Sequence, residues 1–296
     1  MTLHQDFQSW TIRDLMKFSI DHLQRHGFDE ARLTVELLLS HALQFQRIDL
    51  YTHFDQPLKK EELKAFKALF ERRLHHEPVQ YIVGSAGFMG MQFHVDPRVL
   101  IPRPETETLV EQILLVASRV PQGVGLSMFE VGTGSGNIAV STAKLDRRIN
   151  VATIEKDKDA IDVARMNAEK HSVADRTRFV ERSVFDSLVD FETKTFNLLV
   201  SNPPYIAVGE WEKLAEDVRA FEPREALTDG GDGLKFYRRI GEIGKNILLE
   251  GGSVLVEVGY DQSEEVASIF RKAGYADISV TKDLQGIPRV VSGKLS

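Results

Sequence analysis

Apolar residues in the first quarter of the chain recur at the spacing expected for helices that bury one face. Three such sets occur between residues 10 and 76, with polar residues at most of the positions between them. The sets are Leu15, Phe18, Ile20 and Leu23, then Leu33, Leu37, Leu38 and Ala42, then Leu63, Phe66, Leu69, Phe70 and Leu74. This pattern predicts a small helical bundle, which we assign to an N-terminal domain of residues 1–77.

The pattern changes after Pro78. Between Tyr81 and Ile101 the apolar stretches are short and are separated by glycines, which predicts a β-hairpin connector. Pro104 then suits the first turn of a helix that extends to about Ser118, because a proline at that position lacks an N–H that would have no helical partner in any case.

Apolar stretches of strand length alternate with helical stretches from Ser127 onward. Such alternation is typical of an α/β fold, in which helices cover both faces of a mostly parallel sheet. The last two strand candidates are expected to form a hairpin that adds an antiparallel edge. The candidates are Ser127–Val131, Asn150–Glu155, Thr177–Arg182, Phe196–Ser201, Ser253–Val258, Ile278–Lys282 and Arg289–Ser292. We therefore predict a doubly wound, mostly parallel seven-stranded sheet in a domain of residues 78–296.

Composition places the chain among soluble globular proteins, since 42% of its 296 residues are hydrophobic and 27% are charged. The chain has no cysteine, which excludes disulfides and cysteine nucleophiles and suits a reducing cytoplasm. No stretch reaches the ~20 apolar residues of a membrane span, so we expect a cytoplasmic protein that does not bind membranes. The formal net charge of −7 is unlike that of most nucleic-acid-binding proteins, and no direct nucleic-acid partner is expected.

Glycines follow the first predicted strand in the sequence Gly132-Thr133-Gly134-Ser135-Gly136. They allow a sharp turn and a close approach of a ligand to the backbone, and a helix starting near Asn137 directs its free N–H groups to that ligand. Glu155 ends the second strand, nineteen residues after Gly136, where a carboxylate can accept hydrogen bonds from ribose hydroxyls. These features predict a nucleoside site. Glu130, just before the turn, would repel a pyrophosphate but attract the cationic groups of S-adenosylmethionine.

The fourth strand ends in Asn202-Pro203-Pro204-Tyr205. Two prolines form a stiff turn whose carbonyls can only accept hydrogen bonds, and Asn202 adds a side-chain oxygen. Tyr205 adds a flat face. Acceptors in this arrangement suit a planar NH2 group, whose nitrogen is a poor nucleophile until it is oriented toward an electrophilic methyl. The turn therefore predicts methyl transfer to an amide-like nitrogen.

The chain resembles the release factor glutamine methyltransferases, the PrmC/HemK family, along nearly its whole length. The glycine turn and the Asn-Pro-Pro-Tyr turn occur in other methyltransferases, whereas the stretch at residues 100–107 is more specific to this family. The matching stretches are Glu77–Ile82, Leu100–Glu107, Gly132–Gly136, Asn202–Ile206, Phe221–Leu227 and Gly286–Val291. The resemblance implies methylation of the side-chain amide nitrogen (N5) of the glutamine in the Gly-Gly-Gln motif of peptide-chain release factors.

The resemblance also implies roles for particular residues. Gly132–Gly136, Glu155, Val184 and Asn202 would bind the S-adenosylmethionine donor. Asn202, Pro203 and Tyr205 would be catalytic, and the whole turn Asn202–Tyr205 would clamp the substrate amide. Residues 1–77 would help to hold the release factor, the expected protein partner.

Two positions depart from the family pattern. The family often has Asp at the ribose position, where this chain has Glu155, whose longer side chain should still reach. Family members commonly carry an acidic and a bulky residue next to the adenine, and here these positions hold Ser183 and Val184.

Three alternative functions remain. A DNA adenine-N6 methyltransferase also presents a planar NH2 group, but it normally needs a basic channel and a target-recognition region. A ribosomal-protein glutamine methyltransferase shares the amide chemistry, although the sequence Pro-Arg-Pro-Glu at residues 102–105 argues against it. A regulatory protein that only binds the nucleoside would have no use for an amide clamp.

Two arginines and two histidines are further candidates for functional roles. Arg103 and Arg224 lie in family-like stretches near the expected crevice, and they fit either a role at the site or a structural ion pair. His22 and His26 are one helical turn apart but have no further ligand in the pattern, so no metal site is predicted.

Overall fold

The computed structural model describes residues 10–188, 191 and 194–296. They form two compact units: one contains the chain up to Gly84 together with Glu216–Phe221, and the other contains Ser85–Ala215 and Glu222–Ser296. The division falls later than the predicted boundary after Glu77, because Val79 and Ile82 are buried in the core of the first, helical unit.

The helical unit buries the apolar faces of its longer helices against one another. Leu23, Val35, Leu38 and Leu39 are fully buried in this core. Its helices are α1 (Ile12–Arg25), α2 (Ala31–Leu43), α3 (Arg47–Thr52), α4 (Lys60–Leu74), α5 (Val79–Val83) and α9 (Glu216–Phe221). The sequence pattern did not predict α3 or α5, because helices of six and five residues are too short to show a helical period.

Helix α9 joins the helical unit although its sequence neighbours belong to the other unit. An ion pair links Arg73 Nη2 on α4 to Asp217 Oδ2 on α9 over 3.7 Å. Arg73 is buried, and its guanidinium also lies over the ring of Phe28. A segment far along the chain is thus held among the N-terminal helices.

The larger unit contains a seven-stranded sheet with the order β5-β4-β3-β6-β7-β9-β8. The strands β5, β4, β3, β6 and β7 run parallel, and β9 pairs antiparallel with both β7 and β8. The strands are β3 (Leu126–Val131), β4 (Ile149–Glu155), β5 (Thr177–Glu181), β6 (Phe196–Ser201), β7 (Leu248–Glu257), β8 (Tyr275–Lys282) and β9 (Pro288–Leu295). The predicted doubly wound, mostly parallel α/β fold is confirmed.

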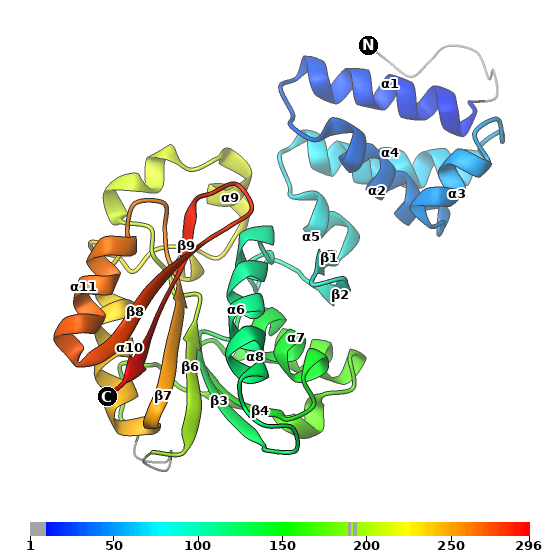
Figure 1. Ribbon diagram of the computed structural model, residues 1–296. Helices are drawn as coiled ribbons and strands as arrows, with labels where there is room; N and C mark the ends of the chain where they lie inside the picture. Colours follow the sequence, from blue (N-terminus) through cyan, green and yellow to red (C-terminus); the bar gives the residue numbers. More distant parts are fainter. Residues whose placement is uncertain (1–9, 189–190, 192–193) are drawn as a thin grey trace. The chain divides into compact units, whose positions relative to one another are not determined.

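Helices cover both faces of this sheet (Figure 1). One apolar core joins α6 (Glu107–Ser118), α7 (Asn137–Leu145) and α8 (Lys158–Lys170) to one face, and a second joins α10 (Lys235–Ile247) and α11 (Ser263–Ala273) to the other. The predicted hairpin is formed by β1 (Ser85–Phe88) and β2 (Met91–His94), and Phe88 and Phe93 anchor it in the first core. Short 3₁₀ helices η1 (Pro104–Thr106), η2 (Ala174–Arg176), η3 (Val208–Lys213) and η4 (Arg224–Ala226) complete the unit.

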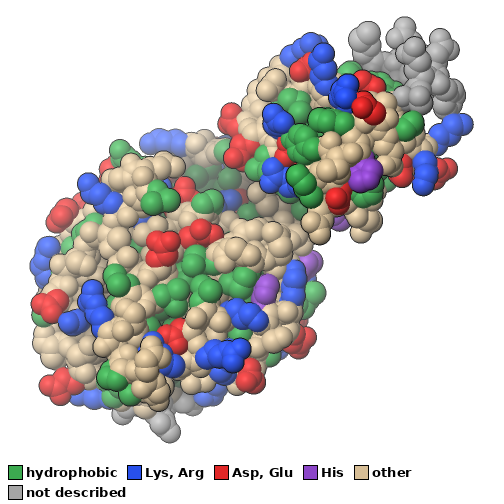
Figure 2. All heavy atoms as spheres, turned by 45° about the vertical axis from the view of Figure 1, so that its right-hand side comes forward, with side chains coloured by type: hydrophobic (Ala, Val, Ile, Leu, Met, Phe, Trp, Pro, Cys, Tyr) green, Lys and Arg blue, Asp and Glu red, His purple; other side chains and the backbone are tan. Residues whose placement is uncertain are grey.

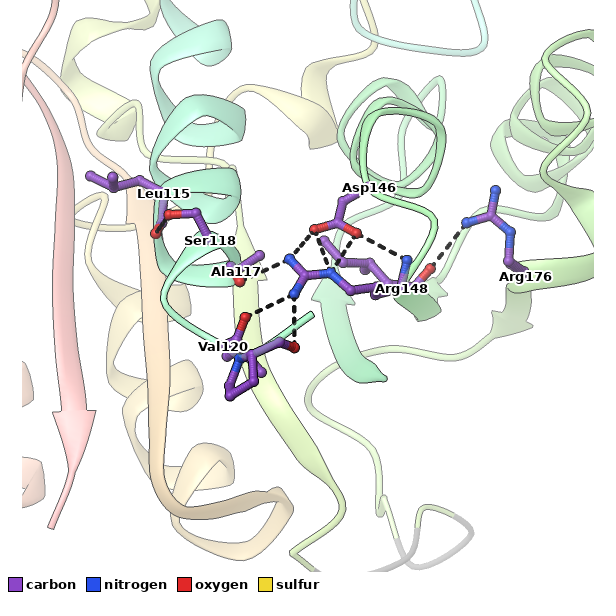
Figure 3. Close-up of polar contacts among 9 residues, drawn as sticks. Leu115, Ala117, Ser118, Val120, Asp146, Arg148 and Arg176 are labelled. Atoms are coloured by element: carbon purple, nitrogen blue, oxygen red, sulfur yellow. Dashed lines mark hydrogen bonds and ion pairs between the residues drawn. The ribbon is translucent and has the colours of Figure 1, made fainter. Parts of the chain in front are cut away.

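Arg148 fixes the carboxyl end of α6 to the start of β4 (Figure 3). Its guanidinium donates hydrogen bonds to the backbone oxygens of Ala117 and Val120, both at 2.9 Å, and forms a forked pair with Asp146. The free carbonyls at a helix end need such donors. The network thus joins the end of α6 to the loop that precedes β4.

Across the described part of the chain, no helix combines the length and the apolar character that crossing a membrane requires.

Candidate functional site

A cavity of about 510 Å³ lies at the carboxyl ends of the central strands of the larger unit. The turns that follow β3 and β6 both contribute to it, and between these two strands the order of the sheet reverses. Ligands of open α/β sheets bind at this switch point. The cavity therefore brings the two predicted motifs, the glycine turn and the Asn-Pro-Pro turn, into one site.

The glycine turn after β3 has three residues with positive φ angles. Gly132, Gly134 and Gly136 have φ angles of 83°, 52° and 78°, which favour glycine over residues with a side chain. Gly132–Ser135 line the cavity. Gly136 instead begins α7 against α8, where an added Cβ would lie only 3.1 Å from Cβ of Ala164. Gly136 thus supports the site through helix packing.

Glu155 lies at the end of β4 and lines the cavity beside the glycine turn. Its two carboxyl oxygens accept hydrogen bonds from the backbone N–H groups of Gly134 (3.4 Å) and Asp157 (3.1 Å). Burial raises the pKa of this carboxyl group, although the same backbone donors oppose the shift. A carboxylate held between two loops at a strand end is well placed to accept hydrogen bonds from a ligand diol.

Glu130 does not face the ligand, contrary to the expectation from sequence. Successive side chains of a strand point to opposite faces, so Val131 lines the cavity while Glu130 is fully buried beneath it. Burial, together with the charge of the neighbouring Glu155, raises the pKa of Glu130 to about 8. A largely protonated group cannot attract a cationic ligand, so the electrostatic argument from Glu130 for the methyl donor is wrong.

Asn202 occupies the cavity wall between the two strand ends. Its side-chain Nδ2 donates a hydrogen bond to Thr106 Oγ1 over 3.1 Å, across 96 positions of sequence. Ser201, just before it, donates to the backbone oxygen of Val131 over 2.7 Å and thereby joins the ends of β6 and β3. Pro203 and Pro204 also line the cavity.

Tyr205 lies beyond the cavity lining and packs against the core beside β7. Its backbone oxygen accepts a hydrogen bond from Gln262 Nε2 over 2.8 Å. An added Cβ on Gly259 would come within 3.2 Å of the ring, so this glycine makes room for it. Burial raises the pKa of the phenol, and Tyr205 is therefore neutral near pH 7.

An aromatic residue missed from the sequence lies next to the predicted adenine position. Val184 is buried and Ser183 lies beside it, both in the cavity lining. Phe185 also lines the cavity and meets Phe236 edge-to-face, with ring centroids 5.1 Å apart. Lys235 Nζ lies 4.5 Å from the centroid of the Phe185 ring. An aromatic residue four positions after the third strand of the sheet was the sequence signal that could have identified it.

The two arginines singled out from sequence both line the cavity and both have partners. Arg103 Nη2 is 2.5 Å from Glu222 Oε1, and the other oxygen of Glu222 accepts a hydrogen bond from the N–H of Ile101. The Arg224 guanidinium lies over the ring of Trp211 at 4.9 Å. The ion pair ties residues 101–103 to residue 222 at the rim of the cavity.

Among the residues described by the structure, no three His, Asp or Glu side chains are arranged to bind a metal ion.

A doubly wound sheet with the glycine turn and the Asn-Pro-Pro turn at its switch point defines a Rossmann-like methyltransferase. Residues 14–84 match the family described as the PrmC N-terminal domain, and residues 112–234 match the methyltransferase small domain. A release factor glutamine methyltransferase of Geobacter sulfurreducens is 42% identical over 97% of each chain, and one of Bacillus subtilis is 37% identical over 95% of this chain and 96% of its own. The chain belongs to the release factor glutamine methyltransferase family.

The solved structures show the same fold. A methyltransferase from Pyrococcus furiosus aligns with a TM-score of 0.50 at 18% identity, covering 76% of this chain and 96% of its own.

Proposed function

We propose that the protein transfers a methyl group from S-adenosylmethionine to the N5 side-chain nitrogen of the glutamine in the Gly-Gly-Gln motif of peptide-chain release factors, and so modulates translation termination. The observation that carries this proposal is the position of Asn202, which shares one cavity with the glycine turn and Glu155. Relatives aligned over nearly their full length are named for the same activity.

The residues at the glycine turn fit the donor. The positive φ angles of Gly132 and Gly134 leave the backbone accessible, and Glu155 provides a carboxylate at the cavity edge. A volume of about 510 Å³ is within the usual range for small-molecule sites. The aromatic face of Phe185 and the side chain of Val184 provide an apolar wall for a nucleobase. The bound donor supplies a methyl group already activated by a positively charged sulfur.

The Asn-Pro-Pro turn supplies the acceptors that a glutamine NH2 group needs. With its nitrogen bonded to Thr106, Asn202 keeps Oδ1 for a substrate hydrogen. The prolines supply carbonyls and no backbone N–H. Acceptors at the two hydrogens orient the nitrogen lone pair, and orientation in a site shielded from water can supply much of the rate.

The loss of the proton does not require a side-chain base. Burial holds Tyr205 in its neutral phenol form near pH 7. Methylation makes the amide nitrogen strongly acidic, so water can take its proton after transfer. The chain therefore contributes binding, orientation and exclusion of water.

The helical domain, assigned from sequence to residues 1–77, is proposed to hold the release factor while the amide enters the cavity. On the face of the larger unit visible in Figure 2, Lys and Arg side chains are interspersed with Asp and Glu side chains. Such a mixed surface suits a protein partner better than the basic channel usual for DNA. A cytoplasmic location fits the absence of cysteine.

Transfer of labelled methyl groups to purified release factor tests the proposed function. Labelling is expected with the Gly-Gly-Gln protein and is expected to be lost when its glutamine is replaced by alanine. Duplex DNA and ribosomal proteins serve as competing substrates in parallel reactions. Equal labelling of the Gly-Gly-Gln protein and its alanine variant would refute the glutamine assignment. Preferential labelling of DNA or of a ribosomal protein would refute it as well.

A further inference from the structure

Thr106 connects the substrate-facing asparagine to a buried acid that has no assigned role. Its hydroxyl accepts the hydrogen bond from Asn202 Nδ2 at 3.1 Å, and it is also hydrogen-bonded to the carboxyl group of Glu257. Thr106 and Glu257 are each 1% exposed. The Oε2 atom of Glu257 has no hydrogen-bond partner among the described residues. These three side chains come from the end of η1, the turn after β6 and the end of β7.

The direction of the hydrogen bonds in this chain decides which end of the Asn202 amide faces the cavity. A threonine hydroxyl has one hydrogen to donate. When Glu257 is ionised, the hydroxyl must donate to it, because a carboxylate can only accept. Thr106 then offers only lone pairs to Asn202, which must place its NH2 group there. The Oδ1 atom is left for the cavity, where a substrate NH2 group needs an acceptor.

Hydrogen bonds that ran in the opposite direction, from Glu257 through Thr106 to Asn202, would inhibit methyl transfer. If Glu257 carried a proton, it could donate to Thr106, and the hydroxyl could then donate to Asn202. The asparagine amide would turn its oxygen to Thr106 and its NH2 group to the cavity. Two NH2 groups would then face each other, and neither could accept a hydrogen bond from the other.

We propose that Thr106 and Glu257 are positioning residues, which hold the amide of Asn202 with its oxygen toward the substrate nitrogen. This inference rests on the proposed amide methylation. It assigns Glu257 an electrostatic role that is distinct from binding of the donor, since Glu257 is absent from the cavity lining.

The surroundings of Glu257 make its charge sensitive to pH in the neutral range. Burial raises its pKa to about 7, while the hydrogen bond from Thr106 and the charges of Arg289 and Arg103 oppose that shift. Glu105 acts in the same direction as burial. Tyr237 donates its hydroxyl to the backbone oxygen of Glu257 over 2.9 Å. The charge of Glu257 also acts on Tyr205, and both phenols remain neutral because burial raises their pKa.

The rate of methyl transfer is therefore expected to increase as pH rises through about 7. The reason is that the ionised carboxylate sets the productive direction of the hydrogen bonds. Glu257→Gln cannot ionise, so this rising limb should disappear from its kcat profile.

The test compares Thr106→Val, Thr106→Ser and Glu257→Gln with the wild type, using release factor as substrate and calorimetry to measure S-adenosylmethionine binding. Thr106→Val keeps the shape but removes the hydroxyl, and kcat should fall by about 10- to 100-fold. Its affinity for the donor should change by less than about threefold, since the glycine turn and Glu155, which are proposed to bind the donor, are unchanged. Thr106→Ser retains the hydroxyl and should recover most of the lost rate.

Three results would overturn the inference: wild-type kcat in Thr106→Val, an equal loss of rate in Thr106→Ser, or an unchanged pH profile in Glu257→Gln. Each is read against an active wild-type enzyme. A wild type that does not methylate the glutamine would instead refute the proposed function itself, so the two failures are distinguishable. Thermal unfolding of each variant shows whether it is folded. If Glu257→Gln does not fold, the comparison of Thr106→Val with Thr106→Ser still tests the inference.

Discussion

The guanidinium of Arg103 lies 2.5 Å from the carboxylate of Glu222, and the pair joins two segments that are 119 positions apart in sequence. The Glu222 side chain is 1% exposed, whereas that of Arg103 is 32% exposed. A buried carboxylate depends on such a partner, because water cannot replace it. The pair therefore joins two of the stretches that match the family, Leu100–Glu107 and Phe221–Leu227.

Removal of Arg103 should destabilise the larger unit. Arg103→Ala removes the cationic partner of the buried Glu222 carboxylate, and we expect a loss of about 1–3 kcal/mol of unfolding free energy, measured by urea denaturation. The double variant Arg103→Ala with Glu222→Gln should lose less, because the buried negative charge is removed together with its cationic partner.

Arg238→Ala is the matched control. Arg238 also pairs with an acid, Asp232, but both side chains are about half exposed. Surface pairs contribute little, so its effect should stay below about 1 kcal/mol. A similar loss in both arginine variants would argue against a special role for the buried pair.

Asn202→Ala should abolish methyl transfer while leaving donor binding nearly unchanged. The substitution removes the acceptor proposed for the substrate NH2 group, whereas the glycine turn and Glu155 remain. We expect a fall in kcat of at least about 100-fold, measured with labelled donor and release factor. Asn246→Ala, at an exposed position on α10, is the control. A parallel loss of donor affinity would assign Asn202 to the donor site instead.

Glu155→Ala should weaken donor binding by at least about tenfold, since hydrogen bonds to a charged acceptor are strong. Calorimetry with S-adenosylmethionine measures this directly. Glu155→Asp should retain part of the affinity, and Glu181→Gln, exposed at the end of β5, should have no effect. Unchanged binding in Glu155→Ala would show that the carboxylate does not contact the donor.

Donor affinity of the wild type should also decrease as pH is lowered. The raised pKa of Glu155 means that its carboxylate becomes protonated at a higher pH than an ordinary glutamate. Protonation removes acceptor capacity, so binding weakens below that point. Glu155→Ala should lack this dependence.

Glu130→Gln should stabilise the protein at pH 8. The pKa of this acid is about 8 in the folded protein, against an ordinary value of 4.5, so the folded state binds more protons than the unfolded state between these values. Stability from this group is therefore lost as pH rises from about 4.5 to about 8. Glutamine has no proton to lose, and the gain should reach a few kcal/mol at pH 8 and vanish near pH 4.

Urea denaturation without ligand, repeated across this pH range, measures the effect. Glu181→Gln is again the control, because its side chain is exposed. A gain that does not depend on pH would mean that Glu130→Gln acts through packing alone.

Arg148→Ala should destabilise the larger unit by about 1–3 kcal/mol, because it removes the guanidinium that donates to the carbonyls of Ala117 and Val120 and to the carboxylate of Asp146 (Figure 3). Thermal unfolding measures the loss. Arg147→Ala changes the exposed neighbour and should alter stability by less than about 0.5 kcal/mol. Equal effects of the two substitutions would exclude the proposed role of the guanidinium.

The sequence by itself determined the local elements of this protein. Apolar runs bounded by turns predicted the strands of the sheet, and the run Phe196–Ser201 matches β6 in full. The glycines also predicted a sharp turn after the first strand, and Gly132, Gly134 and Gly136 in that turn have positive φ angles. These features depend on side-chain period and backbone sterics within a few residues, so they can be read without knowledge of the fold.

Only the tertiary structure decided which distant groups meet. The bond between Asn202 and Thr106 spans 96 positions, and no local pattern encodes it. The sequence predicted that the last two strands form a hairpin, but it did not predict that β9 lies between β7 and β8. The burial of Glu130 and the core packing of Tyr205 depend on which face of each element the folded chain covers. Burial and long-range packing arise from the whole chain, and they set the charge states on which the chemistry of the site depends.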